Sequence, residues 1–363
     1  MPKKLSSDKV LFITTTVLSI FGILMVGSAS YYVAMKQMGN SYHFLIRQII
    51  FVLAGMLLLY LIMNLDYRIY KKKWFINIFL IVTSALLLFV LTMPPIHGTR
   101  RWFSLGFFSI QPSEFAKLAA IFFVAYWLEL KQHRQNDLKE IYGPCLLVVG
   151  GMSLIIAIEP DFGTAFILLL ISGIMFFLAG MRYKQITIIG AAGLAAMALM
   201  VATAPYRISR IFAYLSPDAD PLGSGYQLNQ SLIAIGSGGI TGKHFGSGQQ
   251  KAFFLPDPHT DFIYSVVGEE FGLIGAVLVV VAFLVLLWRG VISSARIHDL
   301  FGYYLGMGIT SMIVVQAFLN IAVATGLVPT KGITLPFISY GGSSIIVNLI
   351  GAGILLNISQ HSS

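Results

Sequence analysis

Two carboxylates and an imidazole stand close together in the segment Asp257-Pro-His-Thr-Asp261, directly before a long apolar run. A carboxylate held where water meets lipid is partly desolvated, which raises its pKa and suits a general base. Asp261, the residue nearest the apolar run, is therefore the first candidate for a catalytic residue. A residue of this type directly before a helix also favours N-capping, and one side chain can serve both roles.

The same segment has the composition of a metal site. Asp257, His259 and Asp261 alternate along the chain, so an extended backbone would place their side chains on one side. Carboxylate oxygens and an imidazole in that arrangement could bind a divalent cation such as Mg²⁺ or Mn²⁺. Polar groups of a solvated loop are the simpler interpretation, and the identity of any metal stays open.

A second pair of charges lies at the start of another apolar run. Glu114 and Lys117 are three residues apart, on one face of a predicted helix, where they can form an ion pair. A charge deep in the bilayer costs about 2.5–3.5 kcal/mol on insertion scales, so each needs a partner or a wet cavity. Pro112 and Glu114 suit a helix start, but Lys117 opposes the helix dipole. This mismatch makes a functional pair as reasonable as a structural one.

Two adjacent arginines precede this predicted helix. Arg100 and Arg101 are followed by the aromatic Trp102. Guanidinium groups bind phosphate through bidentate hydrogen bonds, so the pair suits a phosphate-bearing ligand. Arginines that extend their charge to the membrane interface are the alternative.

Two further turns carry polar groups. Glu159-Pro-Asp161 lies between two apolar runs and is interpreted as a solvated tight turn. The segment 329–344 contains two prolines, the solitary cation Lys331 and the hydroxyls of Ser339 and Ser343. Backbone donors of its Gly-Gly-Ser-Ser sequence, at the start of a helix, would seat an anion. A plain re-entrant turn is the alternative.

Apolar runs of membrane-spanning length position these residues. Of the 363 residues, 57% are hydrophobic and 11% are charged, whereas soluble domains have about 25% charged residues. The composition therefore predicts an all-α polytopic membrane protein, a single domain over residues 1–363, with about 20 residues per span. The ten predicted spans are 10–30, 45–64, 74–93, 115–130, 142–158, 162–180, 186–204, 262–288, 300–324 and 341–358.

The positive charges predict the orientation. The net charge is +9, from 24 basic and 15 acidic residues, but the basic residues occupy short loops, which argues against nucleic acid. Their bias places both termini in the cytoplasm. The predicted outer loops are then 94–113, 159–161, 325–340 and a large loop, 205–262, between spans seven and eight, whose glycines indicate flexibility. The single Cys145 excludes an intrachain disulfide and a thiolate metal site.

Taken in order, these motifs resemble the signatures of the SEDS family, which comprises FtsW, RodA and SpoVE. The matching segments are Arg100-Arg-Trp102, Gln111-Pro-Ser-Glu-Phe-Ala-Lys117, Glu159-Pro-Asp-Phe-Gly-Thr164, His259-Thr-Asp-Phe262 and Gly326-Leu-Val-Pro-Thr-Lys-Gly-Ile-Thr-Leu-Pro-Phe-Ile-Ser-Tyr-Gly-Gly-Ser-Ser344. The form Pro-Thr-Lys-Gly at 329–332 is closer to the FtsW and SpoVE branch than to the RodA branch.

The resemblance implies a peptidoglycan glycosyltransferase that polymerises lipid II outside the plasma membrane, with Asp261 as its essential acid. The implied substrate-binding residues are Arg100, Arg101, Glu114, Lys117 and Lys331, to which we add Lys251, His259, Ser339 and Ser343. The absence of a GxxxxGK phosphate loop agrees with a lipid-linked donor and no nucleotide cofactor. The implied partners are a class B penicillin-binding transpeptidase and other division proteins, at the septum.

Two alternatives stay open. A lipid II flippase would need ionisable groups at mid-bilayer in discontinuous helices, and we expect the spans to be free of charge apart from Glu114 and Lys117. A non-catalytic scaffold for division proteins would tolerate the loss of Asp261.

Overall fold

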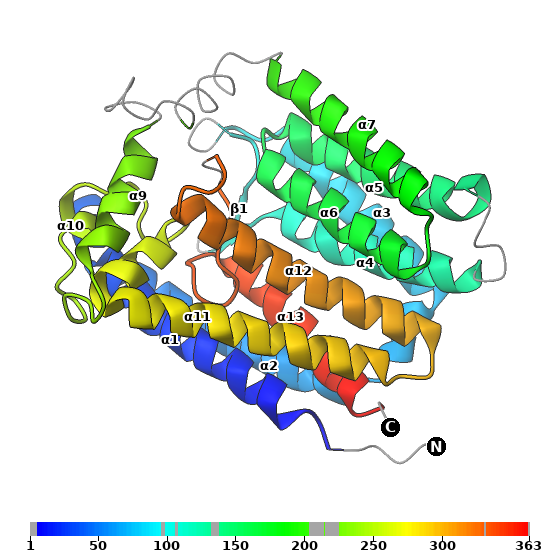
Figure 1. Cartoon of the computed structure of the whole chain (residues 1–363), viewed down its shortest axis with the longest axis horizontal. Coiled ribbons are helices and arrows are strands. Elements are labelled where there is room, and N and C mark those ends of the chain that lie inside the picture. Colours follow the sequence, from blue (N-terminus) through cyan, green and yellow to red (C-terminus); the bar gives the residue numbers. More distant parts are fainter. Residues whose placement is uncertain are drawn as a thin grey trace.

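The computed structural model describes residues 6–95, 99–105, 108–131, 138–202, 214, 225–329 and 332–361. These residues are mostly helical (Figure 1). The long helices are α1 (Lys9–Met38), α2 (His43–Asn64), α3 (Lys73–Val90), α4 (Pro112–Leu130), α5 (Gly143–Ile158), α6 (Phe162–Leu178), α7 (Tyr183–Ala202), α11 (Ile263–Ala295), α12 (Leu300–Ala324) and α13 (Gly342–Ser359). Shorter elements are η1 (Tyr67–Lys71), β1 (Phe103–Leu105), β2 (Phe108–Ile110), η3 (Leu138–Tyr142), α9 (Tyr226–Ser237) and α10 (Gln250–Phe253).

Each of the ten predicted spans coincides with one of the long helices. In the described part of the chain, eight helical segments are long and apolar enough to cross a membrane; they lie in α1, α2, α3, η3 with α5, α7, α11, α12 and α13. The apolar helix α6 is shorter, and α4 contains Glu114, Lys117 and Glu129. The chain is therefore a polytopic helical membrane protein.

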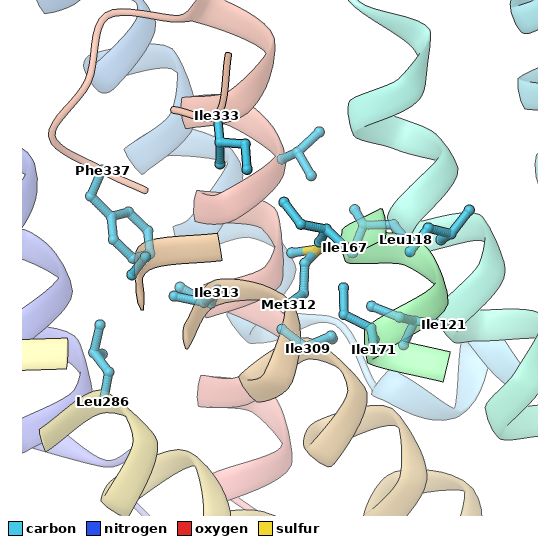
Figure 2. Packing of buried hydrophobic residues seen from close by; sticks show 14 of the residues in the cluster. Leu118, Ile121, Ile167, Ile171, Leu286, Ile309, Met312, Ile313, Ile333 and Phe337 are labelled. Atoms are coloured by element: carbon cyan, nitrogen blue, oxygen red, sulfur yellow. The ribbon is translucent and has the colours of Figure 1, made fainter. Parts of the chain in front are cut away.

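The centre of the bundle is formed by α12 and α13, which lie between the α1 and α11 pair and the group α4 to α7 (Figure 1). Side chains of α4 and α6 interlock with those of α12, where Ile121 and Ile171 approach Ile309 (Figure 2). Small residues allow close approach elsewhere: a Cβ on Gly353 of α13 would lie 2.9 Å from the carbonyl oxygen of Leu59 in α2. In a membrane, such close packing replaces the hydrophobic effect as the main force between helices.

The two ends of the bundle differ. At one end, the backbone N–H of Asp8 donates to Ser359 Oγ over 3.0 Å, and Asp8 also pairs with Arg289, so the start of α1 lies beside the end of α13 (Figure 1). At the other end, the hairpin β1–β2, the turn 159–161, the segment 257–262 and the segment 332–341 meet. The four loops predicted to share one face of the membrane therefore contact one another.

Helix α11 is broken near its start. Gly272 has φ 65° and ψ −160°, a conformation that only glycine adopts readily. The freed N–H groups of Leu273 and Ile274 donate to the carbonyl oxygens of Gly239 (2.9 Å) and Ile240 (3.2 Å). The chain that follows α9 thus supplies backbone acceptors to the second half of α11.

The described part of the glycine-rich stretch packs backbone against backbone. A Cβ on Gly238 would lie 1.9 Å from the carbonyl oxygen of Gly268, and one on Gly242 would lie 2.1 Å from that of Glu270. Gly238 and Gly242 therefore permit close contact with α11, a role that the predicted flexible or turning stretch did not include. A glycine-rich composition is typical both of a flexible stretch and of one that packs closely against a helix. Only the tertiary contacts distinguish the two.

This packing predicts the effect of adding one methyl group. Gly238→Ala should lower the free energy of unfolding by about 1–3 kcal/mol, because the methyl group meets a backbone oxygen that cannot rotate away. Gly236→Ala, at the end of the same helix, is the matched control, since nothing lies within 4 Å of its Cβ position. Thermal unfolding in detergent compares the two variants. Equal stability of the two would contradict the packing role.

Candidate active site

The segment before α11 is a turn rather than a strand. The N–H of Thr260 donates to the carbonyl oxygen of Asp257 over 3.1 Å, which closes a turn in place of the predicted extended backbone. The N-cap of α11 is Phe262, whose side chain makes no capping hydrogen bond. The N-cap position predicted for Asp261 is therefore wrong.

Hydrogen bonds from α12 and from the segment 332–341 hold the backbone around Asp261. Asn320 of α12 donates from Nδ2 to the carbonyl oxygens of Asp261 (2.8 Å) and Ile333 (2.6 Å). Ser339 Oγ donates to the carbonyl oxygen of Thr260 over 2.6 Å and accepts from the N–H of Leu335 over 2.8 Å. The buried Ser339 hydroxyl is thus a positioning group, and the predicted substrate contact has no geometric support.

Apolar anchors fix the segment 332–341 from the other side. Ile333 and Phe337 are both buried and project from this segment into the core (Figure 2). The backbone N–H of Tyr340 donates to the carbonyl oxygen of His259 over 2.8 Å. The segments that carry Asp261 and Gly332 are consequently one rigid unit.

The carboxylate of Asp261 and the guanidinium group of Arg101 converge on Gly332. A Cβ on Gly332 would lie 3.2 Å from Asp261 Oδ2 and 3.9 Å from Arg101 Nη1. A predicted base and a predicted cation, 160 positions apart in the chain, therefore approach the same point. The predicted cation Lys331 lies outside the described residues.

The turn 159–161 orients the guanidinium group of Arg101. Arg101 Nε donates to the carbonyl oxygen of Glu159 over 3.1 Å, and Nη2 donates to that of Pro160. Arg100, in contrast, is exposed and donates from Nη1 to the carbonyl oxygen of Leu91 over 3.0 Å. Of the two predicted phosphate-binding arginines, the structure brings only Arg101 to Asp261.

The acids of this turn are buried, so the solvated-turn interpretation is wrong. Asp161 caps α6 by accepting from the N–H of Thr164 over 3.2 Å, and it also accepts from Gln111 Nε2 over 3.0 Å. Glu159 is 0% exposed. Two nearby carboxylates favour exposure, but here both are buried.

A buried polar network lies beneath the site. The predicted ion pair is confirmed: Lys117 Nζ lies 2.9 Å from Glu114 Oε2 and donates to Gln316 Oε1 over 2.5 Å. Gln316 in turn donates to the carbonyl oxygen of Thr334 over 3.0 Å, in the segment that carries Gly332. Lys117 is 1% exposed, so the pair connects α4 to that segment and does not line an open site.

Comparison with known proteins supplies the family. The sequence profile of the cell cycle proteins FtsW, RodA and SpoVE matches residues 8–363. The chain belongs to this family, the SEDS proteins. It is 43% identical to Stage V sporulation protein E of Bacillus subtilis (strain 168), over 99% of each chain. It is 40% identical to a protein named probable peptidoglycan glycosyltransferase FtsW of Geobacter sp. (strain M18), over 98% of this chain and 97% of the other.

Two solved structures share the fold. One belongs to a study of the structural coordination of polymerization and crosslinking by a peptidoglycan synthase complex; its matching chain is 31% identical with a TM-score of 0.78, over 98% of both chains. The other is the rod shape determining protein RodA of Thermus thermophilus, 26% identical with a TM-score of 0.71, over 99% of this chain and 98% of that one. These likenesses extend the SEDS assignment to the whole bundle.

In this SEDS chain, His259 packs inside the protein. Its ring lies 4.5 Å from the ring centroid of Phe44 and 5.6 Å from that of Tyr340. Burial lowers the pKa of His259 to about 4, although the charge of Asp257 opposes this shift. The imidazole is therefore neutral near pH 7. Its enclosure argues against the predicted contact with substrate.

The predicted metal candidates do not form a group. Among the described residues, no three His, Cys, Asp or Glu side chains are arranged to hold a metal ion. The turn at 257–260 replaces the extended backbone on which the prediction for Asp257, His259 and Asp261 rested. The donor set of this SEDS chain therefore does not fit a metal site built from these three residues.

Ser343 fastens the hairpin to α13. Its hydroxyl accepts from the N–H of Gln111 over 2.9 Å and donates to the carbonyl oxygen of Ser109 over 3.2 Å. Both interactions tie β2 to the first turn of α13. The Ser343 side chain is thus occupied by the protein itself, which argues against its predicted contact with an anionic substrate group.

Lys251 is a structural residue in this SEDS protein, which corrects its predicted role as a substrate-binding cation. Its ammonium group is enclosed and bonds to the carboxylate of Glu270 and to the hydroxyl of Ser28 in α1. The neighbouring Glu269 accepts from Lys243 Nζ over 3.2 Å and from the N–H of Gln249 over 2.9 Å. Two acids of α11 therefore neutralise two lysines of the preceding segment.

The expectation of charge-free spans is wrong for α11. Glu269 and Glu270 lie inside the predicted span 262–288, and both are buried. The signal was present in the sequence, because two adjacent acids in an apolar run require partners. Lys243 and Lys251, in the preceding loop, are those partners.

Removal of Lys251 should therefore destabilise the fold. Lys251→Met leaves the Glu270 carboxylate buried without its cation, and we expect a loss of about 3 kcal/mol in unfolding free energy. The double variant Lys251→Met/Glu270→Gln should recover most of it. Lys243→Met is the control with the smaller loss, because that lysine is partly exposed and Glu269 keeps its backbone donors. A stable Lys251→Met protein with weakened lipid II affinity would restore the substrate-binding role.

Proposed function

We propose that this SEDS protein is a peptidoglycan glycosyltransferase that polymerises lipid II into glycan strands at the outer face of the plasma membrane. The observation that carries this proposal is the convergence of Asp261 and Arg101 on Gly332. The names of the FtsW relatives support the same activity. Undecaprenyl-linked substrates suit a site at one end of a bundle whose sides face lipid.

The reaction proposed is a single inverting displacement. Asp261 accepts the proton of the 4-hydroxyl of the acceptor N-acetylglucosamine as that oxygen attacks the anomeric carbon of the growing chain. The new glycosidic C–O bond forms as the bond to undecaprenyl diphosphate breaks, and the diphosphate leaves with the electron pair. Asp261 later releases the proton to water.

Arg101 stabilises the charge that develops on the leaving diphosphate. Its Nε and Nη2 are held by the carbonyl oxygens of Glu159 and Pro160, and Nη1 is directed toward Gly332. A cation oriented before the reaction needs no reorganisation when charge develops. We assign Arg100 and Lys331 supporting roles in the same charge balance.

The distribution of basic residues supports an orientation in the membrane, and the similar proteins support a role and a partner. The excess of basic residues in the loops at the end with the termini places that end in the cytoplasm and the site outside. The similarity to a sporulation protein and to FtsW proteins supports a role in septal synthesis, at division or at sporulation. We assign a class B penicillin-binding transpeptidase as partner because a similar chain belongs to a complex that coordinates polymerization and crosslinking.

One observation favours the flippase as a second candidate. Helix α11 is discontinuous at Gly272, next to the buried acids Glu269 and Glu270, as an ion-coupled transporter would require. In this chain both acids are paired with lysines, which argues for a structural role instead.

Incubation of the purified protein with lipid II in detergent tests the proposal. Glycan polymer, resolved by gel electrophoresis, supports the glycosyltransferase. Transfer of lipid II across liposome membranes without polymer formation would establish the flippase. The absence of both activities would leave the scaffold as the remaining alternative. Parallel reactions with the transpeptidase measure how far the partner stimulates the rate.

A further inference from the structure

The side chain of Glu159 is buried without a partner. It is fully enclosed, and neither of its carboxyl oxygens accepts or donates a hydrogen bond within the part of the chain that the structure describes. The other groups of the turn are satisfied: Asp161 caps α6, and the carbonyl oxygens of Glu159 and Pro160 accept from Arg101. A buried carboxylate without partners is strongly disfavoured, so this acid is kept neutral or is paired at another stage.

Within the described part of the chain, the charges of Asp161 and Arg101 act on Glu159, and Arg101 belongs to the proposed site. Burial first, and then the negative charge of Asp161, raise the pKa of Glu159 to about 8, while the positive charge of Arg101 opposes this shift. The acid is therefore mostly protonated near pH 7. In that state it does not compete for the positive charge of Arg101.

The bonding of Arg101 shows the consequence of this neutrality. An arginine beside a carboxylate usually forms a bidentate ion pair. Arg101 instead donates to two backbone carbonyl oxygens of the turn and directs Nη1 toward Gly332 and Asp261. Ionised Glu159 would offer a stronger acceptor next to the same guanidinium group and would draw it away from Gly332.

We propose that Glu159 is a proton-controlled positioning residue, which leaves Arg101 available to the substrate diphosphate as a neutral acid and captures it as an anion. The inference rests on the proposed glycosyltransferase function and adds to it a residue that governs substrate binding. The switching step releases one proton from Glu159 to solvent and makes or breaks no other covalent bond.

The direction of the pH effect follows from these charges. As pH rises through about 8, Glu159 ionises and Arg101 is withdrawn, so KM for lipid II should rise about tenfold one pH unit above that midpoint, with kcat less affected. Stability changes at lower pH than KM does. Between the ordinary pKa of 4.5 and about 8, only the folded protein holds the proton, so the contribution of Glu159 to stability falls as pH rises.

The experiment compares wild type with Glu159→Gln, whose amide has the same shape and cannot ionise. KM and kcat for lipid II are measured from about pH 6 to about pH 10, and melting temperature is measured over the same range. Glu140→Gln is the matched control, because Glu140 is a half-exposed acid distant in sequence from the site motifs. Wild type and Glu140→Gln should share the alkaline rise in KM and the fall in melting temperature, and Glu159→Gln should lack both.

The outcomes separate this inference from the function on which it rests. An alkaline rise in KM that Glu159→Gln retains, or identical melting profiles for wild type and Glu159→Gln, would overturn the role of Glu159. Wild-type protein that forms no polymer at any pH would contradict the proposed function. In that case, the affinity for undecaprenyl diphosphate at about pH 7 and about pH 9 still tests the capture of Arg101 by Glu159. Wild type should lose affinity at the higher pH, and Glu159→Gln should not. Equal affinities would overturn it.

Discussion

Replacement of Asp261 by Asn is expected to lower the rate of lipid II polymerisation by at least about 100-fold, because general base catalysis contributes about 10²–10⁴-fold. The amide keeps the shape of the carboxylate but cannot accept the proton of the acceptor hydroxyl. The fold should survive, since the substitution keeps the side-chain shape and the carbonyl oxygen of residue 261 still accepts from Asn320 Nδ2. Initial rates with purified protein measure the effect.

The neighbouring acid provides a control for Asp261. Asp257→Asn removes one negative charge four residues away and preserves a backbone with φ 45°, which Asn tolerates well. This variant should polymerise at a rate within a few-fold of wild type, with unchanged melting temperature. A near wild-type rate for Asp261→Asn would refute the assignment of the base, and a large loss for Asp257→Asn would indicate that the electrostatics of the whole turn matter.

The apolar runs predicted the helices because each span satisfies its own backbone hydrogen bonds and needs no distant partner. The same runs could not show that α11 breaks at Gly272 or that Gly238 and Gly242 pack against it. Those features depend on which backbone atoms meet after folding. A glycine in sequence indicates conformational freedom, and only the contact shows whether the freedom serves flexibility or close approach.

The candidate site could be predicted from the sequence where the chemistry depends on the type of a single residue. Asp261 and Arg101 stood out by type and by position at the ends of apolar runs, and the structure brings both to Gly332. The roles of Lys251 and His259 could not be predicted in this way, because burial and the pairing with Glu270 are tertiary properties. Glu159 was missed as a site residue for the same reason, since a turn with two acids favours solvent.

The ion pair beneath the site carries the second large prediction. Lys117→Met should lower the free energy of unfolding by about 3–5 kcal/mol, because the variant leaves the buried carboxylate of Glu114 without its cation. It also removes the donor to Gln316 Oε1, and Gln316 holds the carbonyl oxygen of Thr334. Polymerisation should therefore fall together with stability, through displacement of the segment that carries Gly332.

A double variant separates the charge from the packing. Glu114→Gln/Lys117→Met contains no unpaired buried charge, so it should regain most of the lost stability while activity stays low because the link to Gln316 is missing. Lys71→Met is the control: Lys71 is 41% exposed in its pair with Glu129, and such pairs contribute about 0–1 kcal/mol. Thermal unfolding and lipid II titration of the four proteins distinguish two mechanisms. If Lys117→Met is as stable as Lys71→Met but binds lipid II weakly, Lys117 contacts the substrate directly and the positioning role is wrong.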